Sequence, residues 1–423
     1  MLYDLIFAVF AVLYMPYFVL KGKWRGFSRQ RLGILPDAFL ARVKDKRAIW
    51  LHAVSVGEVI ASLPLYDEIR KNFPSEKIIV STVTSTGNHI ARERFKGAEV
   101  IYFPVDLSFV TDKVMGSIRP KVVLIAETEI WPNFINSAKK AAAGVVIFNG
   151  RVSKDSFKNY SAVRSILKSV LGKVDLFLMQ MPSDAEKIVY LGAPADKVKV
   201  SGNLKYDAAL FGGKEDERDN FRRKLGISGE HKLFMAGSTH PGEEEIILRC
   251  YKELSKEFPG MRLLIAPRHA ERSQAVAGCV KAAGFKPRFV SMSDHSPSGR
   301  EDVLILDVMG ILAKLYSAGD IIFMGGSLIK KGGQNPLEAA YYSKAVVFGP
   351  HMHNFEGILS ALLSEKAAMR VEDGKDLVKT LRMLMHNPEG TRVMGERARS
   401  VLEANAGVAE KDLEFIEPFL EKA

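Results

Sequence analysis

Short apolar runs recur along the chain and alternate with longer stretches in which apolar residues have a helical spacing. From residue 48 onward, such runs lie at 48–54, 77–83, 98–105, 121–127 and 144–150. Stretches such as 58–72 and 109–118 separate them and have the period of amphipathic helices. Apolar, β-branched runs that alternate with helices predict parallel βαβ units and a doubly wound sheet.

The alternation stops once and then resumes, which predicts a second domain. The polar stretch GGKEDERDN at 212–220 has the composition of a linker. After it, apolar runs return at 232–238, 261–268, 302–308, 320–327 and 344–350. We therefore expect an α/β protein of the GT-B layout, with two Rossmann-like domains facing a cleft. The expected first domain is 48–210, the linker 211–222 and the second domain 223–423.

The first 20 residues are almost wholly apolar, with Asp4 as the single charge. About 20 helical residues can cross a hydrocarbon core of ~30 Å, so residues 1–20 are predicted to form a membrane-anchor helix. A basic membrane-proximal segment, 21–47, follows and contains Lys21, Lys23, Arg25, Arg29 and Arg31. By the positive-inside rule these charges place the body of the protein in the cytoplasm. A buried helix, or one lying in the membrane interface, remains the alternative.

Charge and cysteine content narrow the function classes. The formal net charge of +11 favours an anionic partner, either a membrane surface, a phosphorylated substrate or nucleic acid. Nucleic acid is disfavoured because no zinc-finger or RNP motif is present. Cys250 and Cys279 lie far apart and are expected to be reduced thiols. His351 and His353 have no carboxylate or thiol at ligand spacing, so no metal site is expected.

Polar residues collect directly after the predicted strands, which is where open α/β sheets bind ligands. The sequence Ser-Val-Gly-Glu at 55–58 places the Glu58 carboxylate at a helix start, where it either takes part in chemistry or only caps the helix. Glu127 and Glu129 follow another strand, as site residues or as a capping and turn cluster. Lys205 either enters the same site or faces solvent.

The second half has its own polar clusters after strands. They are Gly237–Glu243, Pro267–His269, Gly325–Ser327 and the loop Gly332–Ala340, which opens a helix. Glycine allows backbone N–H groups to approach a phosphate, and a helix N-terminus carries partial positive charge. The glycine-rich loops, Gly325–Ser327 among them, therefore favour a nucleotide phosphate site in the second half. Glu338 is then available for ribose hydroxyls.

Taken together, these segments resemble the Kdo (3-deoxy-D-manno-octulosonic acid) transferase family. The motifs HAVSVGE, STVTSTG, AETEIWPN, NGRVS, SGNLKYD, AGSTHPGEEE, APRH, GGSL and GGQNPLEAA occur in the family's order and spacing. The resemblance implies an inverting transfer of Kdo from CMP-Kdo to the lipid A precursor lipid IVA in lipopolysaccharide core synthesis. It also implies attachment to anionic lipid on the cytoplasmic side of the bacterial inner membrane. We expect no cofactor.

The resemblance further implies roles for individual residues. Glu58 matches the general base, and Glu127 and Lys205 match positions that stabilise the transition state. The segments that match the CMP-binding ones contain Pro267, Arg268, Met309, Gly310, Ile311, Asn335, Pro336, Leu337 and Glu338. Two residues depart from the family's pattern. Ile311 stands where many relatives have a Glu, which leaves it backbone contacts only, and Gln30 replaces a Glu in the membrane-proximal segment.

Two other functions fit parts of this pattern. One is another GT-B enzyme, either a UDP-sugar transferase or a nucleotide-sugar epimerase, and the other is a non-catalytic membrane scaffold of the same fold. An epimerase needs no membrane anchor, and a UDP-sugar enzyme needs more positive charge to match a pyrophosphate. The monophosphate of CMP-Kdo carries less charge, so fixed cationic side chains and helix dipoles can take the place of a divalent metal.

Overall fold

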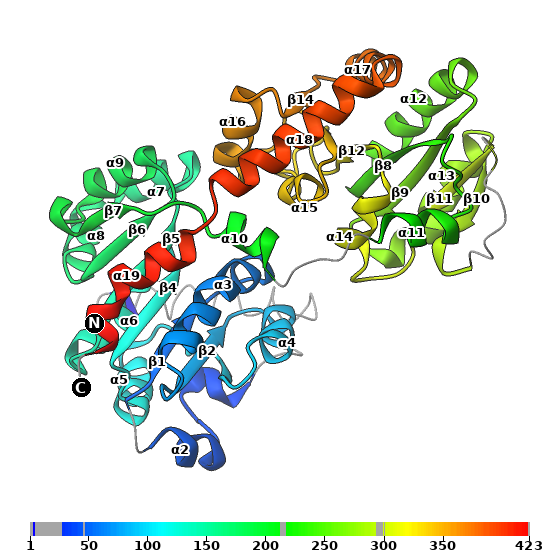
Figure 1. Cartoon of the computed structure of the whole chain (residues 1–423). Helices are drawn as coiled ribbons and strands as arrows, with labels where there is room; N and C mark the ends of the chain where they lie inside the picture. The colour runs from blue at the N-terminus through cyan, green and yellow to red at the C-terminus, as the bar shows by residue number, and fades with distance from the viewer. Residues whose placement is uncertain are drawn as a thin grey trace. The chain divides into compact units, whose positions relative to one another are not determined.

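The computed structural model describes residues 3–4, 28–44, 47–211, 217–292, 299 and 301–421. The chain divides into two compact units, one made of 1–211 with 406–423 and the other of 212–405. Each unit contains one seven-stranded parallel sheet covered by helices (Figure 1). The predicted α/β architecture with two Rossmann-like units is thus confirmed.

The sheet of the first unit has the order β3-β2-β1-β4-β5-β6-β7. Its strands are β1 (Ile49–His52), β2 (Ile78–Thr82), β3 (Glu99–Tyr102), β4 (Val122–Ala126), β5 (Gly144–Gly150), β6 (Leu176–Met179) and β7 (Val198–Val200). Its helices are α2 (Asp37–Val43), α3 (Val56–Asn72), α4 (Ser85–Arg94), α5 (Ser108–Ile118), α6 (Pro132–Lys140), α7 (Lys154–Ala162), α8 (Arg164–Leu171), α9 (Pro182–Leu191), α10 (Lys205–Leu210) and α19 (Val408–Leu420). Because all strand pairs are parallel, the carboxyl ends of the strands meet at one edge.

Side chains of the first sheet alternate between two hydrophobic cores. In β1, Trp50 joins the core that contains residues of α6 and α8. Its neighbours Ile49 and Leu51 point to the opposite face and join the core that contains residues of α3 and α19. All three side chains are fully buried. Since both faces are covered, the central strands are almost continuously apolar, which explains the apolar runs of the sequence.

Helix α19 belongs to the first unit, although it follows the whole second unit in the sequence. Ile416 packs in the same core as Leu51, and the Asp207 carboxylate accepts hydrogen bonds from the backbone N–H groups of Gly407 (2.9 Å) and Val408 (3.2 Å). The boundary thus differs from the expected second domain, 223–423. The contact joins residues 200 positions apart, so no local sequence pattern predicts it.

The sheet of the second unit has the order β10-β11-β9-β8-β12-β13-β14, and its strand pairs are parallel. The strands are β8 (Lys232–Thr239), β9 (Met261–Pro267), β10 (Lys286–Phe289), β11 (Asp302–Ile305), β12 (Ile321–Met324), β13 (Ala345–Phe348) and β14 (Ala368–Arg370). The helices are α11 (Arg218–Lys224), α12 (Glu243–Glu257), α13 (Ser273–Ala282), α14 (Leu312–Leu315), α15 (Leu337–Ala340), α16 (Glu356–Ser364), α17 (Gly374–His386) and α18 (Pro388–Ala404).

Part of the expected linker, 211–222, is folded into the second unit. The Asp320 carboxylate accepts hydrogen bonds from the guanidinium groups of Arg218 (3.0 Å) and Arg222 (3.2 Å) on α11. Arg222 also donates to the carbonyl of Ala318 at 3.0 Å and is buried. These buried ion pairs attach α11 to the loop before β12. The polar composition of this stretch therefore reflects a charged helix as well as a connection between units.

Most of the predicted membrane anchor lies outside the described residues, as does much of segment 21–47. In the part of the chain that the structure describes, no helix has the length and apolarity that a membrane crossing requires. Asp4 is described, and its carboxylate accepts hydrogen bonds from the backbone N–H of Ser108 (2.8 Å) and the side-chain amide of Asn133 (2.9 Å). Asp4 therefore supplies an acceptor at the start of α5, whose own N-cap residue Leu107 has none.

Candidate active site

The candidate residues of the first unit lie where the order of the sheet changes direction. Strands β1 and β4 are neighbours, but the helices that follow them, α3 and α6, pack into opposite cores. Open α/β sheets bind ligands at such a position, outside the carboxyl ends of the strands. Glu58 follows β1 and Glu127 follows β4, so the structure brings both to this position.

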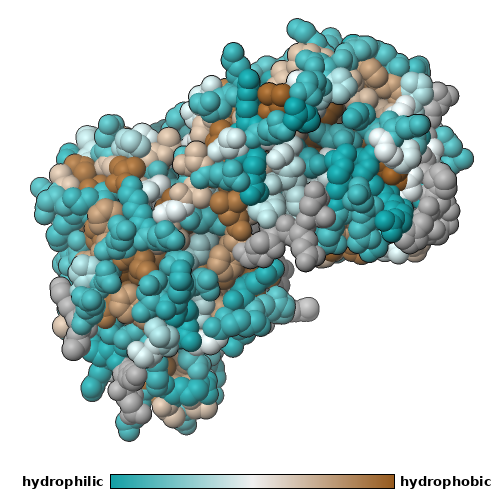
Figure 2. All heavy atoms as spheres, viewed as in Figure 1, coloured by the Kyte–Doolittle hydropathy of each residue, from teal (hydrophilic) through white to brown (hydrophobic). Residues whose placement is uncertain are grey.

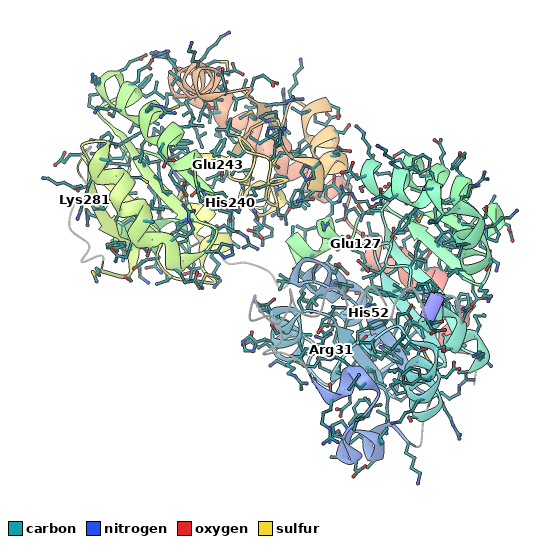
Figure 3. All side chains as sticks on the ribbon, turned by 180° about the vertical axis from the view of Figure 1, so that it is seen from behind. Arg31, His52, Glu127, His240, Glu243 and Lys281 are labelled. Carbon is teal, nitrogen blue, oxygen red and sulfur yellow. The ribbon has the colours of Figure 1, made fainter. Side chains whose placement is uncertain are left out.

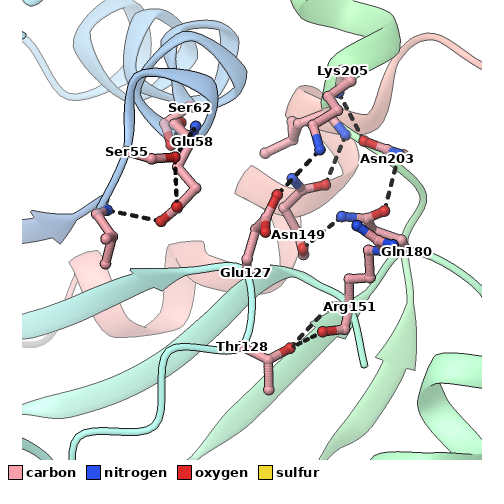
Figure 4. A network of polar contacts seen from close by, with 12 residues as sticks. Ser55, Glu58, Ser62, Glu127, Thr128, Asn149, Arg151, Gln180, Asn203 and Lys205 are labelled. Carbon is pink, nitrogen blue, oxygen red and sulfur yellow. Dashed lines mark hydrogen bonds and ion pairs between the residues drawn. The ribbon is translucent and has the colours of Figure 1, made fainter. Parts of the chain in front are cut away.

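Glu58 is almost fully buried at the start of α3. Its two carboxylate oxygens accept hydrogen bonds from the backbone N–H of Val54 and from the hydroxyl of Ser55, both at 2.7 Å. The Ser55 hydroxyl in turn accepts from the Glu58 N–H at 3.4 Å, which forms a capping box (Figure 4). Glu58 thus caps its helix. Burial, and secondly the charge of Glu127, raise the pKa of Glu58, which is the direction that a general base requires.

Glu127 has a backbone conformation that is rare for this residue type. Its φ is +55°, in the left-handed region, which costs about 1–3 kcal/mol in a residue other than glycine. The carboxylate forms an ion pair with the ammonium of Lys205, with 3.2 Å between Oε1 and Nζ (Figure 4). The structure therefore brings together two of the predicted residues from segments 78 positions apart, and places Lys205 at the site.

Glu129 is a third carboxyl group at this edge of the sheet, and the sequence assigned it no separate role. Burial is the main cause that raises the pKa of Glu129 to about 7, and the charges of Glu58 and Glu127 add to the effect. A carboxyl group with such a pKa can bind or release a proton near neutral pH. This edge of the sheet therefore offers a second carboxyl group, besides Glu58, that can take part in proton transfer.

A network of side-chain amides positions Lys205, and sequence reasoning missed it. Asn149 also has a left-handed φ, of +51°, and its side-chain oxygen accepts from the Leu204 N–H at 3.0 Å. Gln180 donates to the Asn149 carbonyl at 2.9 Å and accepts from the Asn203 amide at 2.9 Å. Asn203 then accepts from the Lys205 N–H at 3.0 Å. Figure 4 shows this chain of contacts running to the Lys205–Glu127 pair.

In the second unit, β8 and β12 are the neighbours at which the sheet order changes direction. His240 follows β8, and Arg268 follows the adjacent strand β9. The Arg268 N–H donates to the Thr239 carbonyl at 2.9 Å, which fixes the two loops side by side. Burial lowers the pKa of His240, and so do the nearby cations, first Lys331 and then His269, Arg268 and Arg272. This strand edge therefore carries a concentration of positive charge.

The glycine loop after β12 is held differently from the expectation. The carboxylate of Glu243 accepts hydrogen bonds from the backbone N–H groups of Gly326 (2.7 Å), Ser327 (3.0 Å) and Leu328 (3.0 Å). It also accepts from the His240 N–H at 3.0 Å, and Figure 3 shows His240 beside Glu243. The predicted phosphate contact of Gly325–Ser327 is thus wrong for the N–H groups of Gly326 and Ser327. They already bind a carboxylate of the chain itself.

The remaining predicted donor residues lie on two loops of the second unit. Met309 is 68% exposed, and Gly310 has a φ of +84° immediately before Ile311 and α14. The Asn335 side chain accepts from the Leu337 N–H at 3.1 Å at the start of α15, next to Pro336. These two loops are available to a ligand at the strand edge.

Pro267 is the last residue of β9. The charges of Glu338 and Arg268 both act on the buried Tyr316. Burial raises the pKa of Tyr316, the charge of Glu338 adds to the rise, and the charge of Arg268 opposes it. Both side chains therefore lie within electrostatic range of the Tyr316 hydroxyl.

The described residues contain no cluster of three or more histidine, cysteine, aspartate or glutamate residues that could hold a metal ion.

The comparisons with solved structures agree with the fold. The UDP-GlcNAc 2-epimerase of Neisseria meningitidis matches with a TM-score of 0.60 and 13% identity, over 88% of this chain and 100% of that one. At this identity the likeness shows the architecture alone. Two parallel Rossmann-like sheets with this arrangement define a GT-B protein, the class of many nucleotide-sugar enzymes.

The sequence comparisons identify the family within this class. The family model for 3-deoxy-D-manno-octulosonic-acid transferase (kdotransferase) matches residues 28–208. The 3-deoxy-D-manno-octulosonic acid transferase of Haemophilus influenzae is 32% identical over 384 residues, which cover 89% of this chain and 88% of the relative. The chain therefore belongs to the Kdo transferase family of glycosyltransferases.

One relative is considerably longer than this chain. The bifunctional glycosyltransferase/methyltransferase of Fusobacterium nucleatum is 35% identical over 416 residues. The match covers 96% of this chain but 62% of that protein, so the chain spans less than two thirds of its length.

Proposed function

We propose that this protein transfers Kdo from CMP-Kdo to the lipid A precursor lipid IVA, with inversion at the anomeric carbon. The observation that carries the proposal is the 32% identity to the Haemophilus influenzae Kdo transferase over 88% of that enzyme. The acidic groups of the first unit and the cationic groups of the second are those that such a transfer needs. A non-catalytic scaffold has no use for the strained Glu127 and its half-buried pair with Lys205.

The reaction requires a proton acceptor on the acceptor side. A sugar hydroxyl oxygen of lipid IVA bonds to the anomeric carbon while its proton passes to the Glu58 carboxylate. Burial and the Glu127 charge both raise the proton affinity of Glu58. Lys205 compensates the negative charge of Glu127 at 3.2 Å. It therefore reduces the repulsion between the carboxyl groups and the negative charge that develops on the attacking oxygen. Glu129, whose pKa is about 7, is a second carboxyl group of this strand edge that can hold a proton near neutral pH.

The reaction also requires stabilisation of the departing phosphate. The bond between the anomeric carbon and the phosphate oxygen breaks, and CMP leaves with the added negative charge. Arg268 lies at the end of β9 with an exposed side chain and is the cation best placed for that phosphate. Its guanidinium is always charged and can bind two phosphate oxygens at once. This division of roles makes a divalent metal unnecessary for the proposed transfer.

Incubation of the purified protein with CMP-Kdo and lipid IVA tests the proposal. We expect mass spectrometry to show lipid IVA that has gained Kdo, and we expect the yield to survive excess EDTA. UDP-GlcNAc in place of CMP-Kdo is the matched donor control and should give no product. Absence of Kdo transfer would reject the function, and a loss of activity on EDTA that Mg²⁺ restores would reject the metal-free phosphate site.

We further propose that residues 1–31 and the start of α5 hold the protein at the cytoplasmic face of the inner membrane. Three apolar side chains next to or within these segments are exposed: Leu32 (44%) and Ile34 (41%) follow residues 1–31, and Phe109 (70%) lies at the start of α5. Elsewhere the surface visible in Figure 2 is mostly hydrophilic, with small separate hydrophobic patches. The contacts of Asp4 with Ser108 and Asn133 favour an attachment in which the first residues stay with the body.

Labelling of a cysteine added at the N-terminus distinguishes the two modes of attachment. Because Asp4 bonds to Ser108 on the body, we expect a membrane-impermeant maleimide to reach this cysteine only after spheroplasts are permeabilised. The native Cys279, which is partly exposed, is the internal control for the cytoplasmic side. Labelling of the added cysteine, but not of Cys279, in intact spheroplasts would mean that the segment crosses the membrane.

A further inference from the structure

The loops after β8, β9 and β12 place cationic side chains around one glycine of the second unit. Gly326 has a φ of +68°. A Cβ added to it would lie 3.3 Å from the His240 ring and 3.4 Å from the Cβ of Lys331. Its N–H and that of His240 bind the same oxygen of Glu243, at 2.7 and 3.0 Å. Lys331 and His240 are therefore held next to each other by backbone contacts that leave little freedom to the loop.

The charges at this edge do not cancel. Arg272 is paired with the Glu244 carboxylate at 2.8 Å. Glu243 is occupied by the four backbone N–H groups described above. Among the described residues, the side chains of Arg268 and Lys331 have no hydrogen-bond or ion-pair partner, and both are exposed. Arg268 and Lys331 are thus two uncompensated cations near His240, one more than a single phosphodiester requires.

The two cations occupy different places along the strand edge. Arg268 acts electrostatically on Tyr316 together with Glu338, the residue expected at the ribose. Arg268 also acts on His240, whose strongest cationic neighbour is Lys331. Arg268 follows β9 and Lys331 follows β12, so the two cations lie on opposite sides of His240 in the strand order β9, β8 and β12. A ligand that lies along this edge meets one cation and then a second cation.

We propose that Lys331 binds the carboxylate of the donor sugar, while Arg268 binds the donor phosphate. The assignment rests on the proposed function. In a 2-ulosonic acid such as Kdo, the anomeric carbon carries both the carboxylate and the bond to the phosphate oxygen. CMP-Kdo therefore presents a ribose, a phosphate and a carboxylate in that order, with two negative charges close together. These two neighbouring negative charges match the two cations Arg268 and Lys331, and a neutral sugar would leave Lys331 without a counter-charge.

Comparison of CMP with CMP-Kdo tests the assignment, because only the second ligand has the sugar carboxylate. For Lys331→Met we expect kcat/KM for CMP-Kdo to fall roughly 10- to 100-fold, as for a lost charge-assisted hydrogen bond. Its Kd for CMP, measured by titration calorimetry, should stay within about twofold of the wild type. For Arg268→Met both quantities should weaken. Lys330→Met removes the same charge from the adjacent exposed position and should change neither.

The possible outcomes are distinguishable. If Lys331→Met weakens CMP and CMP-Kdo by the same factor, Lys331 binds the phosphate and the assignment is overturned. If it weakens neither, or if Lys330→Met has an equal effect, the carboxylate is recognised elsewhere. A wild-type protein that transfers no Kdo would instead reject the proposed function, and the carboxylate assignment with it.

Discussion

Glu58→Gln is expected to lower Kdo transfer by roughly 10²–10⁴-fold, the contribution of a positioned general base. The substitution keeps the size of the side chain but removes the group that accepts the proton. The affinity for CMP should not change, because the residues proposed to bind CMP belong to the second unit. Steady-state turnover at saturating CMP-Kdo, together with calorimetric titration of CMP, measures both quantities on one purified variant.

The capping role of Glu58 requires a control, since the carboxylate also accepts from Val54 and Ser55. Ser55→Ala removes the hydroxyl of the capping box but leaves the carboxylate in place. Loss of an N-cap typically costs about 0.5–2 kcal/mol of stability, so this variant should melt earlier and yet retain most of its activity. A Glu58→Gln protein that is folded, binds CMP and works within tenfold of the wild type would show that Glu58 is only a helix cap.

The central strands of both sheets were predictable, whereas several strands near the edges were not. The runs at 144–150 and 232–238 correspond to β5 and β8, because strands buried on both faces are continuously apolar. Strand β10 reads KPRF and contains Pro287, and β14 has three residues. Both are edge strands of the second sheet. An edge strand tolerates proline and polar residues and can be short, so its sequence resembles that of a loop.

The positions of the site residues were predictable to the extent that they depend on strand ends. Glu58 and Glu127 were expected at one edge because each follows an apolar run, and the structure places both there. The role of Glu243 was not predictable from its motif. Its carboxylate closes a loop more than 80 positions away, and a sequence pattern gives no sign of which carboxylate takes the N–H groups of a glycine loop.

The same reason explains the misplaced end of the second domain. The spacing of apolar residues in α19 predicts a helix, but not the core that the helix joins. Two contacts determine which core α19 joins: Asp207 binds the N-terminus of α19, and the helix packs against α3. Asp207 belongs to the SGNLKYD motif that also contains Lys205. The motif thus combines a residue of the site with one that attaches the end of the chain to the first unit.

Helix α19 also contains a buried acid that lowers the stability of the first unit at neutral pH. Asp412 is fully buried, and neither carboxyl oxygen has a hydrogen-bond partner among the described residues. Burial, and secondly the charge of Asp207, raise the pKa of Asp412 to about 7 from its usual 3.8. The native protein therefore binds this proton more tightly than the unfolded chain does. The stabilisation is complete below pH ~4 and is lost as the pH rises toward 7.

Asp412→Asn is expected to remove the loss of stability of the first unit between pH 4 and pH 7, because an amide of the same shape does not ionise in the folded or the unfolded state. The shift in pKa corresponds to a gain in the free energy of unfolding of roughly 2–4 kcal/mol at pH 8, and to almost none at pH 4. Tryptophan fluorescence during urea unfolding reports this unit, because Trp50 and Trp131 lie in it and the second unit has no tryptophan. Asp67→Asn, at an exposed position of α3, is the matched control and should shift neither curve. An equal gain for Asp412→Asn at both pH values would mean that the pKa of this carboxyl group is the same in the native and unfolded states, and the predicted pH dependence would be wrong.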